Sequence, residues 1–122
     1  MSTVDLRPLS DTFSVAGQIL PDDIKAIKDA GFKSVICNRP DGEEPGMPTF
    51  DVIRDAAQAE GLTALYLPIT HGGLSEDQIA EFEKALDILP GPILAYCRSG
   101  ARSAMLWTTA EGKAQGQAHQ NA

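Results

Sequence analysis

Short apolar runs alternate along this chain with segments whose apolar residues recur at helical spacing. Three runs are typical of strands: 33–37 (KSVIC), 63–69 (TALYLPI) and 92–97 (PILAYC). Three segments are typical of helices: 21–32, 49–60 and 75–90. Consecutive strands joined by helices of this length pair in parallel, and helices cover both faces of a parallel sheet. The alternation therefore predicts an α/β domain, with a parallel sheet of about four strands flanked by helices on both faces.

The two ends of the chain extend this pattern. Residues 12–20 mix β-branched and aromatic residues before a proline, which predicts a short strand or hairpin that leads into the first helix. A last helix is predicted over residues 101–112. Residues 113–122 contain no aliphatic side chain larger than alanine, so we expect them to form a flexible tail. Because no internal repeat divides the chain, residues 1–122 are predicted to form a single domain.

The chain is acidic, with 10 Lys and Arg against 17 Asp and Glu and a formal net charge of -7. A surface of this sign does not neutralise nucleic acid phosphates or anionic lipid, so we expect no nucleic acid or membrane partner. The two cysteines, Cys37 and Cys97, have neither the density of a disulfide framework nor the spacing of a zinc site. No signal peptide is evident at the start of this sequence, and no apolar stretch approaches the ~20 residues that span a bilayer. We therefore expect a cytoplasmic protein without a metal or cofactor.

One segment combines a thiol with two guanidinium groups: 94–105 (LAYCRSGARSAM). The strand that ends at Cys97 leaves room for a tight loop around the sulfur before the last helix, and Gly100 permits the turn. Successive backbone N–H groups in such a loop and at a helix N-terminus bind an anion. Arg102 adds a planar pair of donors, and the same positive surroundings lower the pKa of a thiol. We therefore predict that Cys97 is a nucleophile and that Arg102 binds an anion. The predicted anion-binding loop also contains Arg98, Ser99, Gly100, Ala101 and Ser103.

Four further residues have two interpretations each. His71 has a suitable unperturbed pKa for a general acid, and a hydrogen bond to a backbone carbonyl is the alternative. Arg39 either adds positive potential to the site or holds its own loop through Asp41 or Glu43. Asp41 either reaches the site or forms a turn. Cys37 also ends a strand, and we favour a small core residue over a resolving thiol.

The loop YCRSGARS resembles the active-site loop of rhodanese-type sulfurtransferases. Over about residues 3–112, the chain resembles the bacterial beta-lactamase-hydrolase-like phosphatase family, compact relatives of the protein tyrosine and dual-specificity phosphatases. Three stretches carry this resemblance: VICNRPDGEEPG (35–46), LYLPITHGGL (65–74) and PILAYCRSGARSAMLW (92–107). The resemblance implies a tyrosine-phosphatase-like fold whose active-site loop joins the last strand to the last helix. It also implies that Cys97 is the nucleophile and Arg102 the anion-binding arginine. For some members it implies a sulfur role and a sulfur-oxidising metallo-hydrolase-like enzyme as partner.

The sequence departs from the tyrosine phosphatase pattern in two places. Those enzymes have five residues between the cysteine and the arginine, whereas four residues separate Cys97 from Arg102. The ring that the loop forms between the cysteine and the arginine is therefore one residue smaller. A smaller ring favours a persulfide or a small sulfur oxyanion over a phosphoryl group attacked in line. Residues 70–74 (THGGL) also lack the carboxylate that protonates the leaving alcohol in phosphatases.

These observations predict a cysteine-thiolate enzyme that acts on a small anionic or persulfide substrate through a covalent adduct of Cys97. Sulfur transfer is the favoured reaction because of the smaller ring. Phosphate ester hydrolysis through a cysteinyl-phosphate is the alternative. A non-catalytic anion-binding or interaction module is a further alternative, because no carboxylate acid is evident.

Overall fold

The computed structural model describes residues 5–70 and 72–120, and a sheet of five strands forms its centre. In spatial order the strands are β1 (Arg7–Pro8), β2 (Phe13–Ala16), β5 (Ile93–Tyr96), β3 (Ser34–Cys37) and β4 (Thr63–Tyr66). β2, β5, β3 and β4 are parallel, whereas β1 pairs antiparallel with β2. The predicted sheet of four parallel strands is confirmed, and the two-residue β1 adds an edge strand to it.

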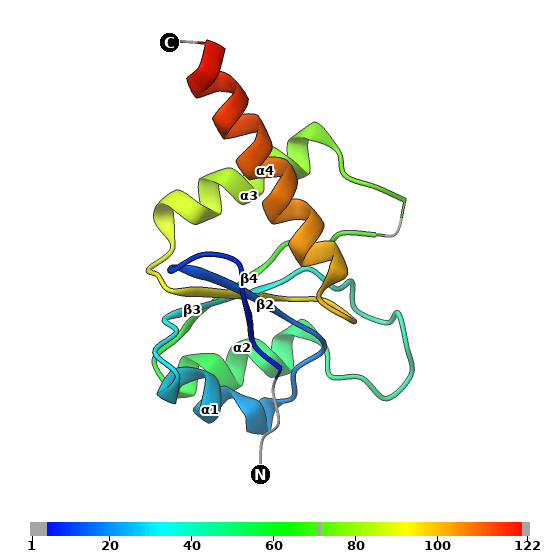
Figure 1. The fold of residues 1–122 in the computed structure, drawn as a ribbon. Helices are drawn as coiled ribbons and strands as arrows, with labels where there is room; N and C mark the ends of the chain where they lie inside the picture. Colours follow the sequence, from blue (N-terminus) through cyan, green and yellow to red (C-terminus); the bar gives the residue numbers. More distant parts are fainter. Residues whose placement is uncertain (1–4, 71, 121–122) are drawn as a thin grey trace.

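Helices cover both faces of the sheet (Figure 1). The helices are α1 (Ile24–Asp29), α2 (Phe50–Ala59), α3 (Glu76–Ile88) and α4 (Ala101–Gln120), and a single turn, η1 (Pro21–Asp23), precedes α1. Figure 1 shows α1 and α2 on one face and α3 and α4 on the other. α4 continues past its predicted end at Gly112, because the Lys, Ala and Gln residues that follow are good helix formers. The flexibility predicted for residues 113–122 stays a prediction.

A local signal sets the start of α3. Ser75 Oγ accepts a hydrogen bond from the backbone N–H of Gln78 at 3.1 Å, and Gln78 Oε1 accepts one from the backbone N–H of Ser75 at 2.9 Å. The two bonds form a capping box at the start of α3, which the Ser-x-x-Gln spacing of residues 75–78 favours.

Within the described part of the chain, no helix is long and apolar enough to cross a membrane.

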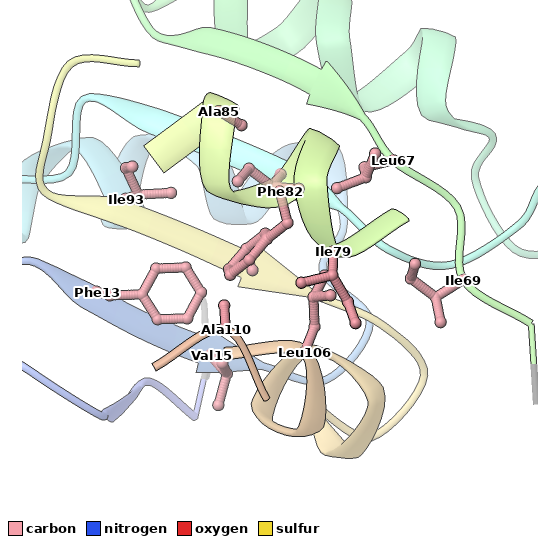
Figure 2. Packing of buried hydrophobic residues seen from close by; sticks show 12 residues of the cluster. Phe13, Val15, Leu67, Ile69, Ile79, Phe82, Ala85, Ile93, Leu106 and Ala110 are labelled. Atoms are coloured by element: carbon pink, nitrogen blue, oxygen red, sulfur yellow. The ribbon is translucent and has the colours of Figure 1, made fainter. Parts of the chain in front are cut away.

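Apolar side chains fill the layer between the sheet and each pair of helices. Figure 2 shows the layer under α3 and α4, where Phe13 of β2 faces Phe82 of α3 and Leu106 of α4 lies close by. The Phe13 ring meets Phe82 edge-on at 5.6 Å and stacks on Trp107 at 4.4 Å between ring centroids. Full burial of one side chain of this size stabilises a fold by roughly 1.5–3 kcal/mol, so this layer anchors the start of α4 firmly to the sheet.

The strand register brings three chain segments to one edge of the sheet. Tyr96 in β5 is the register partner of both Ala16 in β2 and Cys37 in β3. The residues that directly follow these three strands therefore emerge together: Gly17, Asn38 and Cys97. This is the carboxyl edge of the parallel strands, where ligands bind in open α/β sheets.

Candidate active site

The loop that follows Cys97 joins β5 to α4 and packs against the chain that leaves β2. The backbone N–H of Cys97 donates to Ala16 O at 3.3 Å, and that of Gln18 donates to Arg98 O at 3.2 Å. Gly17 lies between these two contacts, and a Cβ atom there would lie 3.0 Å from Arg98 O. The role of Gly17 was not predicted, because only the strand order shows that a side chain at this position would push the loop away.

The Cys97 sulfur is surrounded by backbone N–H groups of its own loop. Gly100 has a φ of +92°, which glycine adopts without strain, and its N–H donates to Cys97 Sγ at 3.1 Å. Burial raises the pKa of the Cys97 thiol, but the nearby N–H groups outweigh burial and hold this pKa below its ordinary value. These N–H groups belong to Ser103, Ser99, Arg102 and Gly100. The loop predicted to bind an anion thus stabilises a thiolate.

We expect iodoacetamide to modify Cys97 at neutral pH and to leave Cys37 unmodified. Burial raises the pKa of the Cys37 thiol, and its Sγ donates to Arg39 O at 3.3 Å. Peptide mass spectrometry across a pH series should give Cys97 an apparent pKa below the ~8.5 of a free thiol. Equal alkylation of both cysteines with the same pH dependence would contradict this assignment of the thiolate.

Arg102 is buried at the first turn of α4 and is 5% exposed. Its Nη1 donates to Glu43 Oε2 and to Ile69 O, both at 2.7 Å, and its Nη2 donates to Glu43 Oε1 at 2.8 Å. A guanidinium has five N–H donors, so these bonds leave the N–H on Nε and one N–H on Nη2. Those two donors are side by side and form a fork that matches an oxyanion. The same guanidinium interacts electrostatically with Cys97, so the fork belongs to the thiol site.

Glu43, in the loop between β3 and α2, binds the opposite edge of the Arg102 guanidinium. The hydrogen bonds from Arg102 lower the pKa of Glu43 most, and Arg39 lowers it further. Burial raises this pKa, but by less, so the pKa of Glu43 is about 2. Glu43 is therefore ionised at neutral pH and does not supply a proton to a leaving group in this arrangement. Glu43 was expected only as a possible partner of Arg39. Its ion pair with Arg102 was not predicted, because its segment is typical of a turn-rich loop and Arg102 lies 59 positions away.

The site thus consists of a cysteine inside a ring of backbone N–H groups, with an arginine fork beside it. The family described as "Beta-lactamase hydrolase-like protein, phosphatase-like domain" matches residues 5–114. The chain belongs to this family. A beta-lactamase hydrolase-like protein of Agrobacterium fabrum is 33% identical over 103 residues, which are 84% of this chain and 24% of that protein. The chain thus spans about a quarter of the length of the curated relatives it matches.

Solved structures share the fold of this phosphatase-like domain. A structure from Neisseria meningitidis, described as a candidate phosphatase, has a TM-score of 0.77 and 31% identity, and the match covers 83% of this chain and 72% of that one. A cysteine-to-serine variant of P. aeruginosa TpbA, solved with phosphotyrosine, has a TM-score of 0.64 at 16% identity, over 86% and 63% of the two chains. The predicted tyrosine-phosphatase-like fold is confirmed.

Arg39 of the phosphatase-like domain lies in the loop after β3, and its side chain is buried. Its Nε donates to Glu43 Oε1 at 3.0 Å, its Nη2 to Glu44 Oε2 at 3.2 Å and its Nη1 to Gln18 Oε1 at 2.9 Å. Arg39 therefore holds its own loop, through two glutamates. Because Glu43 also binds Arg102, the Arg39 guanidinium adds positive charge beside the anion fork as well.

Asp41 is turned toward α2. Its Oδ1 accepts a hydrogen bond from the backbone N–H of Phe50, the first residue of α2, at 2.8 Å. Its own backbone N–H donates to Tyr66 Oη at 2.9 Å. The structure therefore places Asp41 as a distant helix cap, and it does not bring this carboxylate to the Cys97 loop.

Asp41→Ala is expected to lower the free energy of unfolding by about 1 kcal/mol, because the first turn of α2 loses its capping acceptor. We expect turnover per folded molecule to stay within about twofold, since no contact joins Asp41 to the thiol or the fork. Urea unfolding and a phosphatase assay on the same preparation check both values. Asp41→Asn keeps an acceptor oxygen and is the matched control; a large loss of turnover in both variants would instead place Asp41 in the chemistry.

The other residues of the loop differ in what they present. The Arg98 side chain is 65% exposed, and its Nη2 lies 3.9 Å from Glu44 Oε1. Ser99 Oγ accepts a hydrogen bond from the backbone N–H of Ala101 at 3.3 Å, which braces the turn. Ala101 is exposed and begins α4. Arg98 is thus a charged side chain of the loop that faces solvent.

Two residues outside the loop hold it from either side. Asn38 Oδ1 accepts from Ser103 Oγ at 2.8 Å, and Asn38 Nδ2 donates to Leu67 O at 2.8 Å. The Ser103 hydroxyl is thus used for positioning, while its backbone N–H stabilises the thiolate. Arg7 Nη2 donates to Ser99 O at 2.6 Å, and its guanidinium covers Gly100. Neither of these roles, of Asn38 or of Arg7, was predicted.

Cys37 lies in the core. Cys37 and its register partner Tyr96 both belong to the apolar layer under α1 and α2. Side chains alternate along a strand, so Cys97, one position after Tyr96, is directed away from that layer. The core interpretation of Cys37 is confirmed. His71 lies outside the described residues, and its predicted role stays a prediction. Among residues 5–70 and 72–120, no group of three His, Cys, Asp or Glu could hold a metal ion.

Proposed function

We propose that this phosphatase-like domain hydrolyses phosphate monoesters through a phosphorylated Cys97. One observation carries the proposal: the Cys97 sulfur lies inside a ring of backbone N–H groups, and two N–H donors of Arg102 remain available beside it. Such donors match the non-bridging oxygens of a phosphoryl group, on which charge is concentrated in the transition state. The family and the Neisseria structure support phosphate chemistry.

In the first step the Cys97 thiolate attacks phosphorus, the S–P bond forms, and the P–O bond to the alcohol breaks with its electron pair on the leaving oxygen. The loop N–H groups and the Arg102 fork bind the non-bridging oxygens. In the second step water attacks the cysteinyl-phosphate, which releases inorganic phosphate and restores the thiolate. Ionised Glu43 keeps Arg102 in position but does not protonate the leaving oxygen. Aryl phosphates need this proton least, so they are the first substrates to test.

Sulfur transfer was predicted from the single residue that is missing between Cys97 and Arg102. The residue count describes the size of the ring but says nothing of the donors that face its centre. Those donors suit a phosphoryl group, and the family match supports phosphate over sulfur. The predicted sulfur-oxidising partner enzyme stays a prediction.

Arg102→Lys is expected to lower kcat/KM for p-nitrophenyl phosphate by about 100-fold. Lysine keeps the charge, but it cannot bind Glu43 with two donors and offer two more to an oxyanion. Acid quenching during turnover, followed by intact-mass measurement, should show one phosphoryl group on Cys97 of the parent protein and less of this adduct in the variant. Arg54→Lys, at the surface of α2, is the matched control and should keep full activity.

Two outcomes would decide against phosphate hydrolysis. One is a parent protein that neither releases phosphate nor forms the phosphoryl adduct. The other is a gain of one sulfur on Cys97 after incubation with thiosulfate, with no turnover of aryl phosphates, which would restore the sulfur-transfer prediction.

A further inference from the structure

A charged cavity lies beside the Cys97 loop. Its volume is about 270 Å³, and its lining consists of Arg39, Glu43, Glu44 and Arg98. Three of these residues come from the loop after β3, and Arg98 comes from the Cys97 loop itself. The cavity therefore adjoins the thiol site, and every side chain that lines it is charged.

Arginine is concentrated around this cavity and loop. Four of the five arginines of a chain with a net charge of -7 lie here. They are Arg7, Arg39, Arg98 and Arg102. Arg102 has its fork at the thiol, and Arg7 braces the loop backbone. The guanidinium groups of Arg39 and Arg98 remain without a role in the transfer step, although guanidinium pairs are well suited to bind a carboxylate or phosphate.

The carboxylate of Glu44 lies between these two guanidinium groups. Glu44 Oε2 accepts from Arg39 Nη2 at 3.2 Å, Glu44 Oε1 lies 3.9 Å from Arg98 Nη2, and the Glu44 side chain is 44% exposed. By contrast, Glu43 is 21% exposed and binds Arg102 at 2.7 and 2.8 Å. Ion pairs whose carboxylate is open to water contribute little, so an incoming anion can replace the partly exposed Glu44 carboxylate while Glu43 keeps its place.

We propose that Arg39 and Arg98 form a second anion subsite, and that the substrate is a small phosphate ester with another anionic group a few bonds from the transferred phosphoryl. The inference rests on the proposed function, because the first anionic group is the one transferred to Cys97. Glu43 Oε1 accepts from both Arg102 Nη2 at 2.8 Å and Arg39 Nε at 3.0 Å, so one oxygen atom separates the two guanidinium groups. The subsites are therefore adjacent, and a phosphorylated hydroxy acid or a compact bisphosphate spans them.

Binding to Cys97→Ser, which keeps the loop but lacks the nucleophile, tests this. Phosphoglycolate and ethyl phosphate are a matched pair in which a carboxylate replaces a methyl group. Isothermal titration calorimetry should show phosphoglycolate binding about tenfold more tightly. Adding Arg98→Gln should bring the ratio of the two affinities close to one, and adding Glu44→Gln should increase the ratio because the competing carboxylate is gone. Adding Arg54→Gln, on α2, is the control and should leave the ratio unchanged.

The outcomes separate this inference from the proposed function. If both esters bind equally, or if Arg98→Gln leaves the ratio unchanged, the second subsite is wrong while the phosphoryl site stands, and Arg39 and Arg98 only hold the loop. If neither ester nor inorganic phosphate binds to a folded Cys97→Ser protein, the phosphoryl site fails and the second subsite fails with it. Arg98 is largely exposed, so its replacement should not disturb folding, which circular dichroism would verify.

Discussion

Cys97→Ser is expected to lower kcat/KM for p-nitrophenyl phosphate by about 10⁴-fold or more and to leave the fold intact. The backbone N–H groups around Sγ lower the pKa of the Cys97 thiol, but a serine hydroxyl titrates far too high for them to ionise it near neutral pH. Oxygen is smaller than sulfur, so the loop can keep its shape around it. Steady-state kinetics and circular dichroism measure the two effects.

Cys37→Ser is the matched control for this prediction. Cys37 is equally buried and ends the neighbouring strand, but its sulfur donates to Arg39 O and is directed into the core. Its replacement should leave turnover within about threefold, with a modest loss of stability. A Cys97→Ser protein with the turnover of the parent would rule out a covalent cysteine mechanism. A parent without turnover, whose phosphate binding survives in Cys97→Ser, would support the non-catalytic alternative.

Local signals explain how much of this molecule could be predicted from its sequence. The strand runs, the capping box of Ser75 and Gln78 and the glycine in the Cys97 loop all act over a few residues, and the structure has each of them. The α/β class follows because helices between strands leave few other arrangements. The cysteine loop was predictable for the same reason: the cysteine, the turn and the arginine lie within six consecutive positions.

The residues that the sequence did not predict act across the fold. β5 is the last strand in the chain but lies between β2 and β3, and this order brings Gly17 and Asn38 to the Cys97 loop. The ion pair between Arg102 and Glu43 depends on the same strand order. No period or spacing in the sequence indicates this ion pair, because turn-rich loops commonly carry exposed acidic residues. Glu43 approaches the site from another loop and serves as an ion-pair partner, so it does not replace the carboxylate that residues 70–74 lack.

Glu43→Gln is expected to lower the free energy of unfolding by about 3 kcal/mol, which corresponds to a fall in Tm of about 10 °C. Arg102 is only 5% exposed and stays charged, so the loss of its partner leaves a buried cation without compensation. The glutamine amide also turns a donor toward one of the two Arg102 nitrogens. Thermal unfolding followed by circular dichroism measures the loss.

Glu44→Gln is the control for Glu43→Gln. The Glu44 side chain is 44% exposed and its buried partner Arg39 keeps Glu43, so this pair should contribute less than about 1 kcal/mol. The pH dependence distinguishes an ion pair from lost packing. The pKa of Glu43 is lowered to about 2 in the folded protein, from about 4.3 in an unfolded chain, so its stabilisation is present in full above the unfolded value and is lost as the pH falls toward 2. The difference in unfolding free energy between the parent and Glu43→Gln should therefore be constant from about pH 8 to 5 and shrink below about pH 4. A difference that stays constant down to pH 2, or that equals the effect of Glu44→Gln, would mean that Glu43 does not hold Arg102 by charge.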